Sequence, residues 1–232
     1  MAQISGVTLD LDDTLVQYKR SPGEVLRTCF DILNLEQPFS VGEYYARYDE
    51  FADTCDSMDE LRTECFAALA AENGYDRELG RKVAKVFSEE RDQTNVTLLP
   101  SAKQVLDELS SEYALAIITN GARDSQWSKI EAVGLDHWVD TIIVAGHDTP
   151  LKPDPAPFER AITSLGTAPE TTVHIGDSLE TDVAGAKAAG LHSVWIADGA
   201  NPRGFDPTYT VPSIKDLLSL PWVESSEQGD KR

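Results

Sequence analysis

Three aspartates stand within four residues near the start of the chain, directly after an apolar run. They are Asp10, Asp12 and Asp13, in the stretch "TLDLDDTLVQ". Carboxylates this close repel one another, so the folded chain needs a positive charge beside them. The two-residue spacing would direct Asp10 and Asp12 to the same side of an extended chain. Asp13 is expected to be a solvated turn residue.

Further polar residues follow three later runs of β-branched residues. Thr119 and Asn120 close one run, Lys152 lies in the loop after the next, and "GDSLETD" places Asp177 and Asp182 after another. In open parallel sheets, ligands bind at the carboxyl ends of the strands. We therefore expect these side chains to meet the first aspartates at one edge of a sheet.

Carboxylates, one hydroxyl and one ammonium together favour a site for a divalent cation and a phosphate. Mg²⁺ is usually held by one or two carboxylates plus substrate phosphate and water. Lys152 adds a second positive charge without ligand geometry. The crowding of aspartates becomes tolerable if the site holds a cation and receives a phosphate.

The elements that must position these residues alternate along the chain. Helix-like stretches separate the later strand-like runs, which indicates right-handed βαβ units and a parallel sheet. Gly134 and Gly190 stand where two helices should end. The predicted strands are Ile4–Leu9, Ala114–Thr119, Thr141–Ala145, Thr172–Ile175 and Ser193–Ile196, and the predicted helices are Ala102–Ser110, Ser125–Val133, Ala156–Leu165 and Asp182–Ala189.

A segment between the first two strands has a different pattern. It shows four stretches with apolar residues at helical spacing, each opening near Ser or Asp, and no strand pattern. The predicted fold class is α/β, a Rossmann-like parallel sheet core with an inserted four-helix cap. Its predicted parts are a core of residues 1–16 and 96–221, a helical cap of residues 17–95 and a flexible tail of residues 222–232.

Four motifs carry a resemblance to a known family. "DLDDTL", "IITNG", "LKPDPAPFERAITSLG" and "HIGDSLETD" resemble, in order and spacing, the four motifs of the haloacid dehalogenase superfamily. The similarity spans the predicted core, and the insertion is similar to that family's helical cap of the first type. One motif alone would be weak evidence for this resemblance, whereas four motifs in the same order are specific to the family.

The resemblance implies a role for each matched position. Asp10 would be the nucleophile that becomes an aspartyl phosphate. Asp12 would be the general acid and then the base that activates water, and its backbone carbonyl would contact the metal. Thr119 and the Asn120 amide would hold the phosphoryl oxygens, and Lys152 would neutralise charge near the nucleophile.

The fourth motif supplies the remaining implied roles. Asp177 would complete the Mg²⁺ shell together with Asp10 and Asp12. Asp182 is expected to orient Lys152 or a metal-bound water. His147 and His174 lie near the site in sequence, and a structural role is expected for each.

Asp12 also discriminates between reactions within the resemblance. A halide leaves without protonation, whereas an alkoxide leaving group benefits from an acid. The sequence therefore predicts a Mg²⁺-dependent phosphatase that hydrolyses a small phosphate monoester through an aspartyl phosphate. The alternatives are a phosphomutase of the same family, a phosphoaspartate signalling module of the receiver type, and a binding protein on a degenerate core. The complete set of motif residues speaks against the last.

The insertion is expected to close over the site as a lid, which favours small phosphorylated metabolites as substrates. Arg47 and Arg62 flank the turn "DTCDSMD" and are candidate substrate contacts. In so acidic a protein, a salt-bridged or solvated arginine is the alternative for each.

Charge and composition limit the partners. The chain of 232 residues has 40 acidic and 20 basic side chains and a net charge of −20. Such a surface disfavours nucleic acid and anionic membranes as partners. No signal-peptide pattern or long apolar stretch is visible, and three cysteines form no metal-type pair, so a cytoplasmic protein is expected. The excess of acids predicts a halophilic origin, with an ordinary acidic protein as the alternative.

Overall fold

A computed structural model describes residues 3–52, 55, 58–146 and 149–224. The chain divides into two compact units. One unit consists of Met1–Gln17 with Val96–Arg232, and the other of Tyr18–Asn95. The two units are called the core and the helical insertion below. Within the described residues, no helix is both long enough and apolar enough to cross a membrane.

The core is built on a six-stranded sheet in which every neighbouring pair of strands is parallel. The strand order is β5-β4-β1-β6-β7-β8, and the five predicted strands form its first five positions. The sixth strand, β8, was not predicted. The strands are β1 (Gly6–Leu9), β4 (Ala114–Asn120), β5 (Thr141–Ala145), β6 (Thr172–Gly176), β7 (His192–Ile196) and β8 (Tyr209–Val211).

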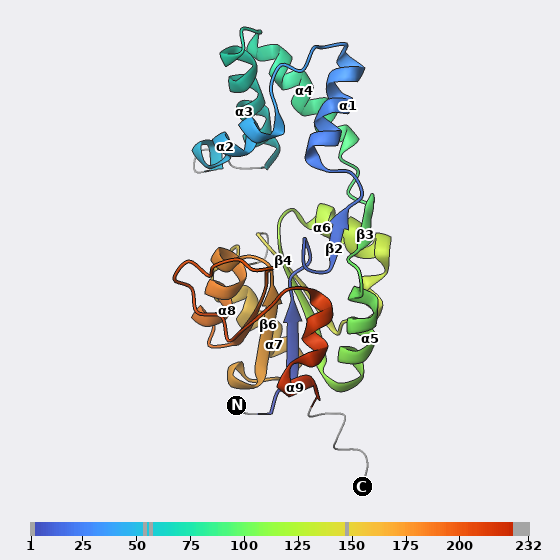
Figure 1. The fold of residues 1–232 in the computed structure, drawn as a ribbon, viewed down its shortest axis with the longest axis vertical. Coiled ribbons are helices and arrows are strands. Elements are labelled where there is room, and N and C mark those ends of the chain that lie inside the picture. Colours follow the sequence, from blue (N-terminus) through green and yellow to red (C-terminus); the bar gives the residue numbers. More distant parts are fainter. Residues whose placement is uncertain (1–2, 53–54, 56–57, 147–148, 225–232) are drawn as a thin grey trace. The chain divides into compact units, whose positions relative to one another are not determined.

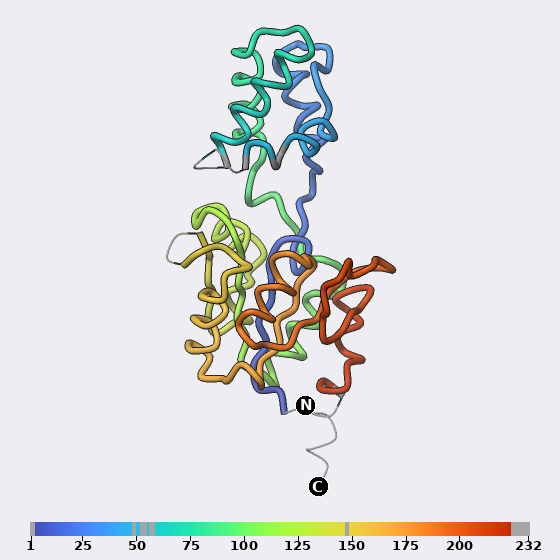
Figure 2. Tube along the Cα trace, turned by 90° about the vertical axis from the view of Figure 1, so that its left-hand side faces the viewer, coloured from blue at the N-terminus to red at the C-terminus, as the bar shows by residue number. Residues whose placement is uncertain are grey.

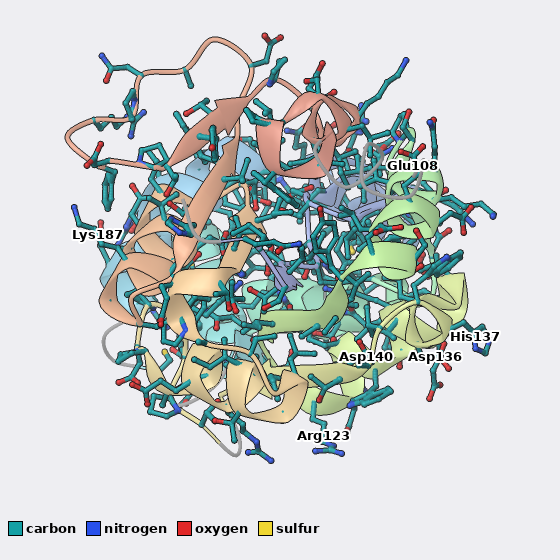
Figure 3. The ribbon with its side chains drawn as sticks, turned by 90° about the horizontal axis from the view of Figure 1, so that it is seen from below. Glu108, Arg123, Asp136, His137, Asp140 and Lys187 are labelled. Atoms are coloured by element: carbon teal, nitrogen blue, oxygen red, sulfur yellow. The ribbon has the colours of Figure 1, made fainter. Side chains whose placement is uncertain are left out.

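Helices cover both faces of this sheet, as the α/β prediction requires. They are α5 (Ala102–Glu112), α6 (Arg123–Val133), α7 (Ala156–Leu165), α8 (Ala184–Ala188) and α9 (Pro221–Glu224), with short turns η1 (Leu135–His137), η2 (Pro169–Thr171), η3 (Leu179–Val183) and η4 (Ile214–Ser219). Figure 1 shows α5 and α8 on opposite sides of the strands. In Figure 3 the sheet lies between Lys187 of α8 and Glu108 of α5.

Successive side chains of β4 pack alternately into two apolar clusters, one on each face of the sheet. Leu115 and Ile117 pack in the cluster that includes α5, Ile130 of α6 and η4. Ala116 and Ile118 pack in the cluster that includes α7 and α8. Successive side chains of a strand point to opposite faces, so a central strand must be apolar at every position.

Two predicted helix ends are confirmed by backbone conformation. Gly134 ends α6 at φ 69°, and Gly190 follows α8 at φ 77°, both left-handed. The predicted tail is wrong for its first three residues, because α9 extends to Glu224 and Val223 packs into the core. The remainder of that tail lies outside the described residues.

The helical insertion carries the four predicted helices among its described residues. They are α1 (Pro22–Leu33), α2 (Val41–Ala52), α3 (Met58–Glu72) and α4 (Arg77–Glu90). Ser21 starts α1 with a reciprocal capping box to Glu24, and Pro22 occupies the first turn. Figure 2 shows these helices side by side in the blue-to-green part of the chain.

The insertion has its own apolar core, separate from the core beside the sheet. Phe66 is fully buried at its centre and stacks edge-on against Phe87 and Tyr44. Cys29 and Cys65 are buried there as free thiols. The chain segments that lead into and out of the insertion pair as a two-stranded sheet of β2 (Val16–Tyr18) and β3 (Val96–Leu98).

Candidate active site

Asp10 extends β1 by one residue at the carboxyl edge of the sheet. Its backbone N–H donates to the carbonyl of Ile175, 2.9 Å away, so the parallel pairing with β6 continues through this position. The residue is 8% exposed. A buried carboxylate requires a partner, because removing an ion from water costs several kcal/mol.

Lys152 supplies that partner from the chain that follows β5. Its Nζ lies 2.6 Å from Asp10 Oδ1, 2.6 Å from Asp182 Oδ1 and 2.9 Å from the carbonyl oxygen of Ile118. An ammonium group has three donors, and these three acceptors use all of them. Lys152 is 4% exposed, and its charge is held by two carboxylates that the sequence predicted would lie near it.

Asp182 is oriented by a buried histidine as well as by the lysine. His174 Nε2 lies 3.1 Å from Asp182 Oδ1, and His174 Nδ1 lies 2.8 Å from the Thr8 hydroxyl. A carboxylate only accepts, so Nε2 donates to Asp182 and the Thr8 hydroxyl donates to Nδ1 of the neutral ring. The Asp182 side chain fits here because residue 176 is a glycine. A Cβ at Gly176 would lie 2.3 Å from Asp182 Cγ.

Asp177 completes a group of three carboxylates. One oxygen from each of Asp10, Asp177 and Asp182 lies within 4.8 Å of the others. The Thr14 hydroxyl donates to Asp177 Oδ1 at 3.4 Å, and Trp195 Nε1 donates to the Asp177 carbonyl at 2.8 Å. Oxygen ligands so grouped fit a hard divalent cation.

The acids of this group differ in their affinity for protons. Burial raises the pKa of Asp10 to about 7, because lost hydration and the charge of Asp182 outweigh the attraction of Lys152. Burial and the charges of Asp182 and Asp13 raise the pKa of Asp177 to about 6. Two neighbouring carboxylates whose pKa values are raised chiefly by burial are typical of a functional site.

The pKa of Asp182 shifts in the opposite direction. Burial disfavours its anion, but the hydrogen bond from His174 and the charge of Lys152 lower the pKa of Asp182 to about 2. Burial lowers the pKa of His174 and keeps the ring neutral. Although burial opposes its charge, Asp10 and Asp182 raise the pKa of Lys152. The Lys152–Asp182 pair is therefore an ammonium and a carboxylate.

Thr119 and Asn120 close β4 at the same edge of the sheet. The Thr119 side chain is buried. The Asn120 side chain clamps the backbone of Lys152 with two hydrogen bonds. Its amide nitrogen donates to the Lys152 carbonyl at 3.0 Å, and its Oδ1 accepts from the Lys152 N–H at 2.8 Å. This clamp fixes the loop that carries the lysine.

Asp12 has partners that the sequence did not indicate. Lys129 Nζ lies 2.8 and 2.7 Å from its two carboxylate oxygens. Gln126 Nε2 donates to Asp12 Oδ2 at 3.3 Å and to the Asn120 carbonyl at 2.6 Å. Both partners project from α6. Asp13, by contrast, is exposed with φ 58°, as expected for a turn residue.

The two candidate arginines of the insertion are held in ion pairs there. Arg47 pairs with Glu50 at 2.8 Å and also with Glu72. Arg62 pairs with Asp59 at 3.1 Å and lies over the Phe87 ring. These contacts match the salt-bridged alternative, and a substrate contact for either arginine stays a prediction. Most of the turn between them, residues 53–54 and 56–57, and the predicted structural His147 lie outside the described residues.

The sequence matches a family model over most of its length. Residues 4–190 match the model described as haloacid dehalogenase-like hydrolase. The N-acylneuraminate-9-phosphatase of Rattus norvegicus is 32% identical over 95% of this chain and 94% of its own. The glyceraldehyde 3-phosphate phosphatase of Methanopyrus kandleri is 27% identical over 94% of this chain and 97% of its own.

Solved structures agree on the fold. The putative hydrolase YfnB of Bacillus subtilis, whose crystal structure was determined with bound magnesium, superposes with a TM-score of 0.78. The match covers 94% of this chain and 98% of that one at 23% identity. A likeness at this identity shows the fold of the core and the presence of an inserted helical cap.

Proposed function

Because this chain belongs to the haloacid dehalogenase-like hydrolases and is a phosphatase of that family, we propose that it hydrolyses a small phosphate monoester through an aspartyl phosphate on Asp10, with Mg²⁺ as cofactor. The contact between Lys152 Nζ and Asp10 Oδ1, 2.6 Å long inside a cluster of three carboxylates, carries this proposal. It supports a buried nucleophile kept beside a fixed positive charge.

In the first step, an oxygen of the Asp10 carboxylate attacks phosphorus and the bond to the ester oxygen breaks. Asp12 gives its proton to the departing oxygen, which leaves as an alcohol. The Thr119 hydroxyl and the Asn120 N–H donate to the phosphoryl oxygens. Lys152 offsets the negative charge of the group being transferred.

In the second step, the ionised Asp12 takes a proton from water. The resulting hydroxide attacks phosphorus, and the bond to Asp10 breaks, which regenerates its carboxylate and releases phosphate. The covalent intermediate divides one difficult displacement into two easier ones. Asp12 therefore gives up a proton in the first step and takes one up in the second.

The donor set fits the proposed cofactor. Asp10, Asp177 and the backbone carbonyl of Asp12 would hold Mg²⁺, with Asp182 turned toward Lys152. The raised pKa values of Asp10 and Asp177 support this, since each carboxylate gains from a nearby cation. When bound, Mg²⁺ supplies Lewis-acid stabilisation of negative charge on the phosphoryl oxygens.

Small phosphorylated metabolites are the proposed substrates. Two relatives that match along almost the whole chain carry names that describe action on N-acylneuraminate 9-phosphate and on glyceraldehyde 3-phosphate. We propose that the helical insertion is a lid whose side chains select among such esters. Hydrolysis of a panel of sugar, amino acid and glycolytic phosphates, with and without Mg²⁺ and with salt varied up to molar concentration, tests this. Absence of turnover on every ester would overturn the proposal.

Two alternatives have their own observable signatures. A phosphomutase would pass the phosphoryl group to a second hydroxyl of the substrate, and a bisphosphorylated intermediate would accumulate. A signalling module would keep its phosphoaspartate for minutes or longer instead of releasing phosphate. Release of inorganic phosphate in repeated turnovers with no bisphosphorylated species separates the phosphatase from both.

The role of Asp12 leads to a test with two kinds of leaving group. In the Asp12→Asn variant, we expect the first step to slow by about 10²–10⁴-fold for an alkyl phosphate, because the departing alkoxide loses its acid. An aryl phosphate has a stable leaving group, so its first step should slow much less. Rapid-quench measurement of phosphoenzyme formation on the two esters gives both rates. Equal losses would exclude Asp12 as the acid.

Protons compete with Mg²⁺ for the carboxylates of Asp10 and Asp177, so we expect metal binding to depend on pH. Asp10 and Asp177 have pKa values raised to about 7 and about 6, so both bind protons more tightly than an ordinary carboxyl group at mildly acidic pH. Mg²⁺ requires the ionised forms, so its affinity should rise as pH rises through these values and level off above them. We expect on the order of 10²-fold weaker binding at pH 5.5 than at pH 8. Titration calorimetry in two buffers would also detect the released protons, and a constant affinity across this range would contradict the prediction.

A further inference from the structure

A buried lysine and a buried glutamine on one face of α6 hold both carboxylate oxygens of Asp12. Lys129 Nζ contacts Oδ1 at 2.8 Å and Oδ2 at 2.7 Å, and Gln126 Nε2 adds a contact to Oδ2 at 3.3 Å. Lys129 and Gln126 are 4% and 5% exposed. Residues three apart on a helix are neighbours, so the two side chains reach the carboxylate together.

The burial of Lys129 requires an explanation of its own. Lysine is almost never fully buried unless it is paired, because its ammonium ion loses hydration. Here the cost is offset by both oxygens of a single carboxylate. A lysine that served only to cover apolar surface would extend its ammonium into water instead.

Gln126 links Asp12 to the loop proposed to bind phosphate. The same Nε2 that reaches Asp12 donates to the Asn120 carbonyl at 2.6 Å. Gly121, at φ 137°, leaves space for this side chain, because a Cβ there would lie 2.7 Å from Gln126 Nε2. The orientation of Asp12 is thereby tied to the end of β4.

From this geometry we infer that Lys129 and Gln126 are positioning residues for Asp12, setting the orientation in which its carboxyl group meets the ester oxygen and, later, the attacking water. The inference rests on the proposed role of Asp12 as acid and base. An unrestrained aspartate samples several rotamers, whereas two contacts on its carboxylate remove that freedom before substrate arrives. Orientation fixed in advance lowers a barrier without adding binding energy for the substrate.

A double-mutant cycle between Lys129 and Asp12 tests the inference. For an alkyl phosphate, we expect Lys129→Met to lower kcat by at least about 10-fold with KM nearly unchanged, and to cost much less with an aryl phosphate. In the Asp12→Asn background, the same replacement should cost less than about 2-fold, because there is no acid left to orient. Gln126→Met should act in the same direction more weakly.

A control variant, a check of the fold and a second mutant cycle keep the test decisive. Lys103→Met, which removes an exposed lysine that pairs with Asp107 on α5, serves as the matched control and should leave kcat unchanged. Circular dichroism and thermal unfolding identify loss of fold, and if Lys129→Met unfolds, Gln126→Met with Asp12→Asn completes the cycle. Equal losses from Lys129→Met in the wild-type and Asp12→Asn backgrounds, or equal losses on alkyl and aryl esters, would overturn the inference.

The outcome of Asp12→Asn alone separates this inference from the proposed function. If Asp12→Asn shows no dependence on the leaving group, the proposed acid is wrong, and the inference falls with it. If that dependence is present while Lys129→Met adds its full cost in the Asp12→Asn background, the proposed function stands and the positioning role is excluded.

Discussion

Replacement of Asp10 by asparagine is expected to abolish phosphoenzyme formation and to lower turnover by on the order of 10⁴-fold or more, as loss of the nucleophile does in other covalent enzymes. An amide is a poor nucleophile and gives no stable phosphorylated product. The carbonyl oxygen of the new amide would still accept a hydrogen bond from Lys152, whose other partner Asp182 remains in place. The fold should therefore survive.

Intact-protein mass spectrometry after rapid quenching measures this result directly. Wild-type protein mixed with substrate should gain the mass of one phosphoryl group in a fraction of molecules, and Asp10→Asn should gain none. Asp136→Asn is the matched control, because it makes the same chemical change at an exposed residue outside the cluster of three carboxylates. A phosphorylated Asp10→Asn protein would place the nucleophile elsewhere.

Removal of divalent metal is expected to lower turnover by on the order of 10³-fold, which corresponds to several kcal/mol of lost charge stabilisation. Without a cation, Asp10 and Asp177 would repel the incoming phosphate, and burial already raises the pKa of each carboxyl group. Activity should return when Mg²⁺ is added to protein freed of chelator. Full turnover in excess chelator would contradict the proposed cofactor.

Asp177→Asn gives the cleaner variant for the same question. It removes one proposed ligand and leaves the nucleophile intact, so excess Mg²⁺ should restore part of the activity. Asp10→Asn would remove the ligand and the nucleophile together. The informative quantity is the Mg²⁺ concentration at half-maximal rate, which should rise in Asp177→Asn and stay unchanged in an exposed control such as Asp136→Asn.

The fold was predictable where the chain repeats a strong local pattern. The bounds of β5 and α7 match the sequence prediction at both ends, because β-branched and amphipathic runs there end at clear turn residues. The last strand, β8, has only three residues and pairs with one neighbour, β7. So short an edge strand carries too little periodicity to be distinguished from a loop.

The helix predicted at Asp182–Ala189 illustrates a different limit. The chain forms a π-helical turn from Leu179 to Val183 before α8 begins at Ala184. Asp182 therefore lies inside the turn, with its carboxylate accepting from the Ser178 N–H at 3.1 Å. A local hydrogen bond of this kind, from a backbone N–H to a side chain, leaves no trace in apolar spacing.

The partners of Asp12 were missed for a reason that the helix itself explains. Lysine and glutamine on an amphipathic helix usually indicate its solvent face. Yet Gln126 stands three residues before Lys129 and four before Ile130, a fully buried position, so the three share one side of α6. Reading the position on the helix before the residue type would have marked both polar residues as buried groups that require partners.

Lys152 has a consequence for folding as well as for chemistry. Its three donors join Asp10 at the end of β1, Ile118 in β4 and Asp182 in η3, so one side chain cross-links three segments that are far apart in sequence. Removing it would leave two buried carboxylates facing each other, a change that typically costs about 3–5 kcal/mol. Many enzymes gain stability when a catalytic residue is replaced. At Lys152 we expect the opposite, since the charge proposed to serve the reaction also links these three segments.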